Sequence, residues 1–566
     1  MKPLAAAAAI VAIAGVTVAT QNTPTDRVGG AAAILTSDDV LAVLTVAANA
    51  LGNDTLAAAV VDRTGAILGV YARPAAAVTA PDEAVTLARA GAMFANDQAP
   101  LSSRTVRFIS GIHYPPGIQN TPNAPLYGIE STNRGCQVDA AGDAVFNTPV
   151  ARPASIAGTF PALPNVAPLP CLPSNTSGCS TVGLTTGKRD VFDSGQSDPA
   201  TVPVNPGGVP IYRGGKVIGG VGVTGVPADF AEYAATLAAA GAGRDIDFSE
   251  PLGAPGAVFI DGVRLPFFGA CPDIPCIRST VKTSPAGAVG GRFTDGRLVA
   301  GPRGGSQAPE GYLIGPRASG VPGGLSIDDV RQIVNQSVAV ALRTRAQIRL
   351  PASQPTRMIM ALSDPAGQIL AAYRMPDATF FSLDVAMAKA RNAYYFSTRD
   401  GYEVLRGYVA AHTYDNYSWE PDPPAGQGWA ITARTLSFAG QPLFPPGIVL
   451  TSPPTPGPWF DLFRYDTSNP CTEGPGPTRG GNRSYLNQSG VVWFPGSAPL
   501  YRNGQLVGGL GVSGDGVDQD DYVSLGGSEA FHPPDALRVD NSVIRTGDGR
   551  VVRLPYLKLP RQPELP

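Results

Sequence analysis

A glycine-rich hairpin sequence occurs twice in the chain and limits its possible folds more than any other feature. The first copy, residues 210–225, reads PIYRGGKVIGGVGVTG, and the second, residues 499–514, reads PLYRNGQLVGGLGVSG. Each predicts a strand, a tight turn and a second strand, because Gly and Asn accept the positive φ of hairpin turns. Gly219 and Gly220 lie inside the second strand, where paired glycines mark a bulge or the close approach of another backbone or a ligand. Sheet packing and ligand approach both stay open as explanations.

Other blocks repeat in the same order in both halves of the chain. Each half contains a helix start with a capping box, in which Thr36 or Ser326 is followed three residues later by Asp. An Asp-x-x-Gly turn between apolar runs and an alanine-rich helix ending in Phe follow. The matching blocks are 35–40 and 325–330, 59–71 and 360–373, 83–94 and 383–396, 103–105 and 433–435, 115–118 and 445–448, and 263–268 and 552–557. We therefore expect two similar domains, residues 33–268 and 324–557.

Long irregular segments interrupt these blocks. The 566 residues include 67 Gly and 56 Pro, a composition that favours long loops. The first domain has an insertion at residues 119–206, and the second has insertions at 402–428 and 449–489. Residues 269–323 are interpreted as a linker and residues 558–566 as a tail. Segments of this length in compact domains are usually lids, interfaces or disordered loops.

Residues 1–22 have the features of an export signal. Lys2 is followed by an apolar run at residues 4–18 and by small residues that fit a cleavage site near Ala19. An uncleaved anchor is the alternative, but the run is short for a bilayer span. We therefore expect a periplasmic or secreted protein without a membrane span in the mature chain. The formal net charge of −3 gives no reason to expect nucleic acid as a partner.

Six cysteines predict disulfides, because an even count in an exported protein favours disulfide bonds. A metal site is the alternative, but the spacings do not repeat as a ligand set and no His accompanies them. The pairs expected from closeness in the sequence are Cys171 with Cys179 and Cys271 with Cys276. Cys136 and Cys471 remain, at matching places of the two halves. If the domains pair about a pseudo-twofold axis, a bridge between these two cysteines would join them.

The order of the blocks and the ending Gly-Gly-x-Gly-Val-[ST]-Gly resemble the GlcG/HbpS-like haem-binding family, which also supplies the C-terminal domain of PduO proteins. Residues 207–210 match the lead-in to this motif, whereas residues 496–499 depart from it. Residues 512–521 match its acidic end better than residues 223–229 do. The resemblance covers both halves apart from the insertions. It implies an α+β fold of two tandem profilin-like domains, each an antiparallel sheet flanked by helices, with long Pro/Gly-rich loop insertions.

The resemblance also implies a function. Family members form homo-oligomers, and several bind haem non-covalently, with links to haem sensing or degradation. The implied protein is an exported haem- or tetrapyrrole-binding protein with haem as its cofactor. The alternative is a non-catalytic small-ligand-binding or assembly module, built from an internal pseudo-dimer of duplicated domains. Whether the chain is an enzyme stays open.

His113 is the candidate iron ligand of the first half. It lies next to a block that both halves keep, and neutral imidazole is a good iron ligand. Tyr114 could serve instead, and a loop histidine without a metal is the plain alternative. The residue aligned with His113 in the second half is Leu443. The other residues grouped with this ligand site are Pro116, Gly117, Gly208, Gly219 and Gly220.

The remaining polar candidates have simpler explanations. His412 lies among the aromatic residues of the 402–428 insertion, where stacked rings could flank a flat ligand or form an ordinary loop core. His532 precedes two prolines and is expected at the surface. The acidic run is expected to form a solvated turn, with cation binding as the alternative; its members are Asp518, Asp520 and Asp521. No nucleophile elbow, Walker loop or zinc-protease motif is present, and a dinucleotide-binding reading of residues 219–225 lacks the following helix.

Overall fold

The computed structural model describes two antiparallel five-stranded sheets, one in each half of the chain, with helices packed on them. This confirms the predicted α+β class. The described residues are 34–77, 80–110, 126–129, 132, 205–241, 259–260, 263–265, 287, 289–291, 295–445, 455–468 and 490–565.

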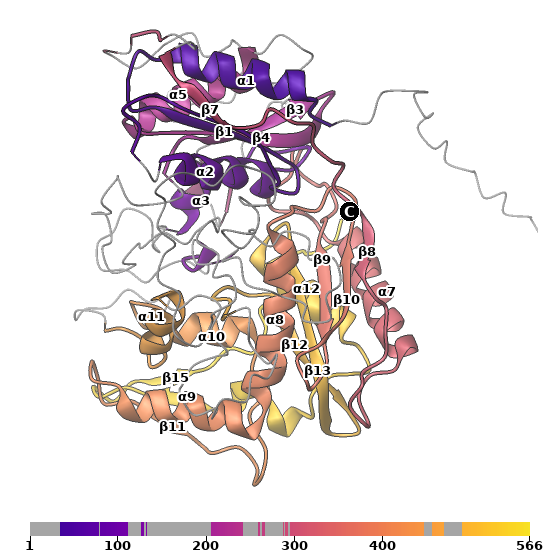
Figure 1. Ribbon diagram of the computed structural model, residues 1–566. Helices are drawn as coiled ribbons and strands as arrows, with labels where there is room; N and C mark the ends of the chain where they lie inside the picture. The colour runs from indigo at the N-terminus through magenta and orange to yellow at the C-terminus, as the bar shows by residue number, and fades with distance from the viewer. Residues whose placement is uncertain are drawn as a thin grey trace, which may run out of the picture.

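The sheet of the first half has the strand order β3-β4-β1-β2-β7. Helices α1 and α5 pack together on one face, and α2 packs on the opposite face, which is turned toward the second half (Figure 1). A two-stranded ribbon, β5-β6, completes the described strands of this half. The elements are α1 (Ser37–Ala50), β1 (Ala57–Asp62), β2 (Ile67–Ala72), α2 (Ala80–Phe94), α3 (Ser103–Ser110), β3 (Gly208–Arg213), β4 (Lys216–Thr224), α5 (Ala228–Gly241), β5 (Phe259–Ile260), β6 (Val263–Arg264) and β7 (Arg297–Ala300).

The sheet of the second half repeats this plan in the order β12-β13-β9-β10-β8. Helix α7 packs with α12, as α1 does with α5, and α8 lies across β13 and β9 as α2 lies across β4 and β1. Both glycine-rich sequences form the predicted hairpins, β3-β4 and β12-β13. The elements are β8 (Gly311–Ile314), α7 (Ile327–Arg343), β9 (Ile359–Ser363), β10 (Ile369–Arg374), α8 (Ser382–Ser397), β12 (Ser497–Arg502), β13 (Gln505–Ser513) and α12 (Val517–Gly527).

The predicted capping boxes are present and are tied to the hairpins. Thr36 Oγ1 accepts from the Asp39 N–H, and Asp39 Oδ2 accepts from the Thr36 N–H at 2.8 Å. Arg213, at the end of β3, forms an ion pair with the same carboxylate at 2.9 Å. Asp39 therefore both caps the start of α1 and binds the β3-β4 hairpin to this helix. The second half repeats the set with Ser326, Asp329 and Arg502.

The segment interpreted as a linker contributes an edge strand to each sheet, so that prediction needs correction. Strand β7 pairs with β2, and β8 pairs with β10, in the same register: Ala300 faces Val70, and Ile314 faces Ala372. Each strand is followed by Gly-Pro-Arg, whose arginine donates its backbone N–H to the neighbouring strand at 3.0 Å in both halves. The first domain therefore extends beyond residue 268, and the second begins before residue 324.

The C-terminal segment, expected to be a tail, pairs with the chain that follows α7. The Leu565 N–H donates to the Arg343 carbonyl at 2.8 Å, and the Arg345 N–H donates to the Pro563 carbonyl at 2.7 Å. Glu564 adds an ion pair with Arg343 at 2.9 Å. This segment is therefore part of the second domain.

A second, aromatic core lies beside the sheet of the second half (Figure 1). The inserted segment begins with a helix at Arg399, slightly earlier than predicted, because Thr398 caps this helix by accepting from the Gly401 N–H at 3.0 Å. A three-stranded sheet, β11-β14-β15, closes the aromatic core. Its further elements are α9 (Arg399–Ala411), β11 (Ser418–Glu420), α10 (Ala433–Ala439), α11 (Phe460–Ser468), the 3-10 turns η5 (Asp535–Leu537) and η6 (Val539–Asn541), β14 (Val543–Arg545) and β15 (Val551–Arg553).

The two halves meet through residues that are not equivalent. Phe94, at the end of α2, stacks on Phe381 with ring centroids 4.1 Å apart. Phe396 occupies the matching place in α8 but packs in the aromatic core against Tyr395. The described contacts are therefore head-to-tail, and the expected pseudo-twofold pairing does not hold for them. The physical reason is that the aromatic core covers the C-terminal end of α8. In a twofold arrangement this end of α8 would have to contact the first domain, as the end of α2 contacts the second.

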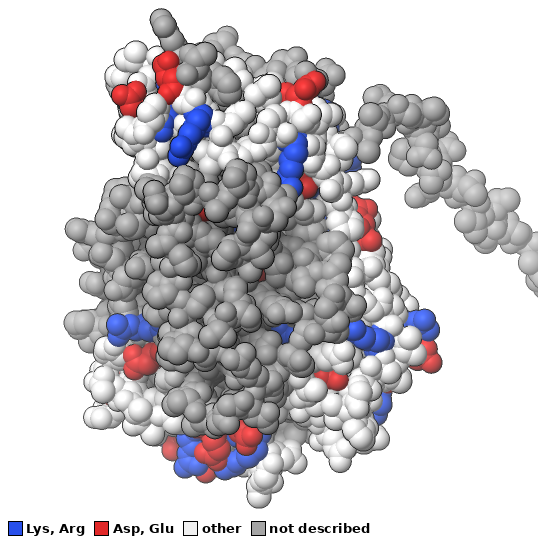
Figure 2. All heavy atoms as spheres, in the orientation of Figure 1, with Lys and Arg blue, Asp and Glu red and all other residues white. Residues whose placement is uncertain are grey.

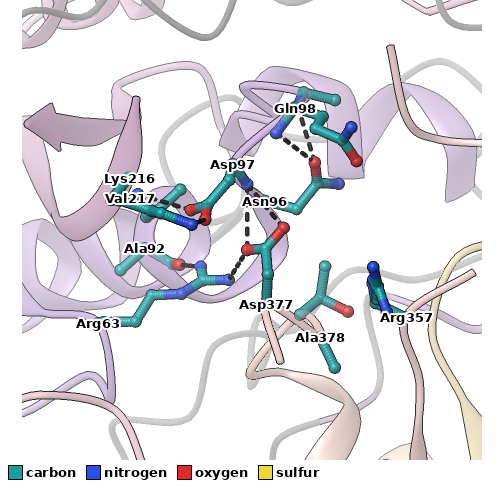
Figure 3. A network of polar contacts seen from close by, with 12 residues as sticks. Arg63, Ala92, Asn96, Asp97, Gln98, Lys216, Val217, Arg357, Asp377 and Ala378 are labelled. Carbon is teal, nitrogen blue, oxygen red and sulfur yellow. Dashed lines mark hydrogen bonds and ion pairs between the residues drawn. The ribbon is translucent and has the colours of Figure 1, made fainter. Parts of the chain in front are cut away.

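A polar network joins residues of the two halves (Figure 3). The Asp97 N–H donates to the Asp377 carboxylate at 3.1 Å, and Lys216 pairs with the Asp97 carboxylate at 2.8 Å. Arg349 Nη1 donates to Asp377 Oδ2 at 2.5 Å, and its Nε donates to the buried Asp515 of the second half. Arginine thus links the interface to the interior of the second domain.

The described surface carries charges of both signs. On the face shown in Figure 2, blue and red atoms are interspersed rather than gathered by sign. Several belong to ion pairs, such as Arg406 with Asp422 at 3.8 Å. Among the described helices, none has the length and apolarity that a bilayer span requires. The six cysteines and residues 1–22 lie outside the described residues, so the disulfide and export predictions are not tested.

Candidate functional site

The predicted ligand-site glycines lie against backbone atoms. A Cβ at Gly208 would come within 1.9 Å of the Leu87 carbonyl, and one at Gly220 within 2.2 Å of the Ala88 carbonyl, both in α2. A Cβ at Gly219 would come within 2.3 Å of the Val61 carbonyl in β1. Close packing of helix and sheet therefore accounts for each glycine. A ligand contact at these positions stays a prediction.

The other predicted site residues fall outside the described part of the chain: His113, Tyr114, Pro116 and Gly117. Helices α3 and α10, which precede the two aligned segments, begin alike. The Ser102 N–H donates to Thr105 Oγ1 at 3.1 Å, and the Thr432 N–H donates to Thr435 Oγ1 at 3.3 Å. Leu443 is the residue that aligns with His113 in the sequence.

His412 lies in the aromatic core, in the region that follows α10. Its side chain is fully buried, and its ring centroid is 4.8 Å from that of Tyr417 and 5.0 Å from that of Tyr414. Tyr417 in turn contacts Phe444, with ring centroids 5.8 Å apart. Phe444 follows Leu443, so His412 belongs to the same aromatic cluster as the counterpart of the predicted site.

The surroundings of the His412 imidazole favour its neutral form. Neither nitrogen makes a hydrogen bond of good geometry. Burial lowers the pKa of His412, while Asp461, Asp415 and the Pro456 carbonyl oppose this lowering. Asp461 Oδ2 lies 4.0 Å from Nδ1. A neutral imidazole with an unshared lone pair is the form that binds a metal ion.

Three further polar atoms in this region have no hydrogen-bond partner among the described residues: Trp429 Nε1, Gln441 Oε1 and Trp459 Nε1. Gln441 and Trp459 lie in neighbouring segments, because the Gly457 N–H donates to the Gln441 carbonyl and the Trp459 N–H donates to the Ala439 carbonyl. Buried polar atoms are normally paired, so such a group of unpaired atoms requires a local explanation.

His532 does not share these properties. Its Nε2 lies 2.9 Å from the Leu525 carbonyl, and its side chain is outside the aromatic core. Among the described residues, no group of three or more His, Cys, Asp or Glu side chains is arranged to hold a metal ion.

The acidic run of α12 is neither a solvated turn nor a cation site, so both earlier readings are corrected. Asp520 and Asp521 are buried, and each forms an ion pair with a lysine or arginine side chain of another helix. Lys389 Nζ lies 3.1 Å from Asp520 Oδ2, and Arg434 binds Asp521 and Asp518. Burial raises the pKa of Asp520 to about 7, against the opposing effect of Lys389.

Sequence reasoning missed Lys389 and Arg349. Lys389 lies in an alanine-rich helix whose exposed face normally takes lysine, and no local signal separates a buried lysine from an exposed one. Arg349 lies in a loop, and its partners are distant in the sequence. The edge strands β7 and β8 did leave a signal, namely the repeated Gly-Pro-Arg at residues 301–303 and 315–317.

A comparison with known protein families finds a match in the second half of the chain. Residues 461–528 match the model of a family described as haem degrading protein HbpS-like. The chain is similar to the crystal structure of a PduOC:heme complex, with 22% sequence identity and a TM-score of 0.20. The matched region covers 37% of this chain and 95% of the chain in that complex. A second match is the crystal structure of Klebsiella pneumoniae protein ORFY, with 16% sequence identity and a TM-score of 0.20. It covers 40% of this chain and 94% of the ORFY chain. None of the curated proteins compared with the chain matches it. The chain is therefore similar to the HbpS-like family over the region from α11 to α12.

Proposed function

We propose that this chain binds haem or a related tetrapyrrole non-covalently. The observation that carries the proposal is the match of residues 461–528 to a family described as haem degrading. Haem sensing and haem degradation would each depend on this binding.

The chain is further proposed to contain two copies of the same domain. In support, the two sheets have the same strand order, and both hairpins are tied to a helix start by an Asp–Arg ion pair. A second ion pair recurs as well: Arg104 binds Asp229 and Glu232, as Arg434 binds Asp518 and Asp521. Shared contacts of this kind favour duplication over chance similarity of two sheets.

In the first domain, His113 is the proposed iron ligand. Haem would supply an iron atom, and the imidazole of His113 would hold it, since imidazole is a common ligand of haem iron. Export to the periplasm or outside the cell, with removal of residues 1–22, belongs to the same proposal.

The second candidate function is a non-catalytic binding or assembly module. It is favoured by the glycines of the hairpins, which contact helix backbone and leave no room for a side chain there. Under this alternative the duplicated domains serve only to dock on one another through the Phe94–Phe381 stack.

A haemin titration followed in the Soret region separates the two functions. Haem binding predicts a saturable red shift of the Soret band with wild-type protein, and the assembly module predicts none. In the His113→Ala variant we expect the loss of part of this shift. His532→Ala is the matched control, since His532 is bonded to a backbone carbonyl and should leave the titration unchanged.

A further inference from the structure

His412 begins a short surface loop, residues 412–417, which leads from α9 to β11 and is called the His412 loop below. The His412 side chain is fully buried, and neither ring nitrogen has a hydrogen-bond partner among the described residues. The rings of Tyr414 and Tyr417 pack against it, with centroids 5.0 Å and 4.8 Å away. A neutral imidazole is stable in such surroundings, whereas a buried cation without hydrogen bonds is costly.

Two carboxylates and one carbonyl lie around the imidazole. Asp461 Oδ2, in the first turn of α11, is 4.0 Å from Nδ1. Asp415 also favours the charged imidazole, but its carboxylate already accepts the Gly547 N–H at 2.9 Å. The Pro456 carbonyl already accepts from the Tyr417 hydroxyl at 2.9 Å. Asp461 is therefore the group best placed to approach a protonated imidazole.

Tyr414 shares Asp461 with the imidazole. Tyr414 is 38% exposed, and its ring meets the His412 ring edge-on. Its hydroxyl donates to Asp461 Oδ1 at 3.5 Å and accepts from Arg464 Nη1 at 3.2 Å. Both contacts are long for hydrogen bonds, so they hold the His412 loop to α11 only weakly. A turn of the Asp461 carboxylate toward Nδ1 would break the first of them.

We propose that His412 is an acid-sensitive switch, in which protonation of the imidazole draws Asp461 away from Tyr414 and releases the His412 loop from α11. The imidazolium needs a partner that the closed loop does not give it. The two five-stranded sheets have a separate core, so the opening stays within the aromatic core. The switch is independent of haem binding.

The expected pH range follows from the burial of His412. Burial lowers its pKa in the closed loop, and Asp461, Asp415 and the Pro456 carbonyl oppose this lowering. An exposed histidine has a pKa of about 6.5, so the open loop binds more protons than the closed one just below this pH. The closed loop is therefore stable above about pH 6.5. Below it, the equilibrium shifts toward the open loop by at most about tenfold per pH unit.

Tryptophan fluorescence reports on this region selectively, because all four tryptophans of the chain belong to the aromatic core. Trp419 follows the His412 loop by two residues and contacts Trp459, with ring centroids 5.3 Å apart. Opening of the loop should let water reach these rings and shift their emission to longer wavelength. Circular dichroism, which reports on all helices and sheets, should change little.

The test follows the emission of the full-length chain, without haemin, from pH 7.5 to pH 5. Wild-type protein and the control His532→Ala should show the same reversible red shift. His412→Phe keeps an aromatic ring but cannot be protonated, and its emission should stay constant. Asp461→Asn removes the partner of the imidazolium and should move the midpoint to lower pH. A constant emission of wild-type protein, or a wild-type response of His412→Phe, would overturn the inference.

A second measurement uses wild-type protein alone and does not depend on the folding of any variant. Hydrogen exchange followed by mass spectrometry is compared at pH 7.5 and pH 5.5, after correction for the pH dependence of the chemical exchange rate. Peptides that contain the His412 loop should lose protection at pH 5.5, whereas those from the β12-β13 hairpin should keep it. Equal protection of the His412 loop at both pH values would refute the switch.

Discussion

Lys389 Nζ lies 3.1 Å from Asp520 Oδ2 in the interior of the second domain, where the first domain has Leu87 and Ala231. The hairpin glycines establish this equivalence. A Cβ at Gly207 would meet Val223, Ala231 and Leu87, and one at Gly496 would meet Val512, Asp520 and Lys389. The same architecture therefore folds with an apolar pair or with a buried ion pair. Lys389 also donates to the Val512 carbonyl and lies 4.5 Å from the Phe494 ring centroid.

Transferring the apolar pair of the first domain to the second should be tolerated. Replacement of a buried ion pair by apolar residues is often neutral or stabilising, by about 1–4 kcal/mol, whereas removal of one partner costs about 3–5 kcal/mol. We expect Lys389→Leu and Asp520→Ala to be destabilising alone and close to neutral together. Urea unfolding of the two single variants and the double variant measures this. Additive losses in the double variant would contradict the expectation.

The stability of the second domain should depend on Asp520 between about pH 4 and pH 7. Burial raises its pKa to about 7 in the folded chain, against about 3.9 for an unfolded aspartate. The folded state therefore binds the extra proton in this range, and stability falls as pH rises, by at most about 1.4 kcal/mol per pH unit. Asp520→Asn should flatten this part of the profile. Identical wild-type and variant profiles in denaturant unfolding would show that the group does not titrate there.

Arg349 should be required for the docking of the two domains. Its side chain is 2% exposed and binds both Asp377 and Asp515. Its removal therefore leaves Asp515 without its cation and leaves Asp377 with Arg63 alone, at 4.0 Å. We expect Arg349→Ala to destabilise the chain by about 3–5 kcal/mol. Arg345→Ala is the matched control, because Arg345 makes only an exposed contact with a backbone carbonyl. Unfolding midpoints that are alike for the two variants would count against this role.

The two edge strands should respond alike to the same substitution. Gly301 and Gly315 have φ values of +72° and +71°, and a Cβ would come within 2.2 Å and 2.1 Å of a strand carbonyl. Alanine at either position should cost about 1–3 kcal/mol or more, from strain and overlap. Gly311→Ala is the control, since Gly311 has φ +79° but open space around it, and should cost less. A loss at only one of the two positions would argue against their equivalence.

Much of each domain could be predicted because its signals are local. The capping boxes at Thr36 and Ser326 and the glycine hairpins involve residues close in the sequence, and all of them are present. The edge strands were missed because each has four residues and lies in a Gly/Pro-rich segment without alternating hydrophobicity.

The arrangement of the domains and the candidate site could not be derived in the same way. The stack of Phe94 on Phe381 joins residues from different halves, and nothing near either residue marks the contact. His412 was noted as part of an aromatic segment, but its closeness to Phe444 results from tertiary packing through Tyr417.

Gel filtration of the full-length chain after incubation with excess haemin tests the central claim most directly. The number of haem groups that elute with the protein is read from its Soret absorbance after denaturation in alkaline pyridine. Haem binding predicts a coloured protein peak, with two equivalents per chain if both domains carry a site. A colourless protein peak, with all haemin eluting in the free fraction, would contradict the account.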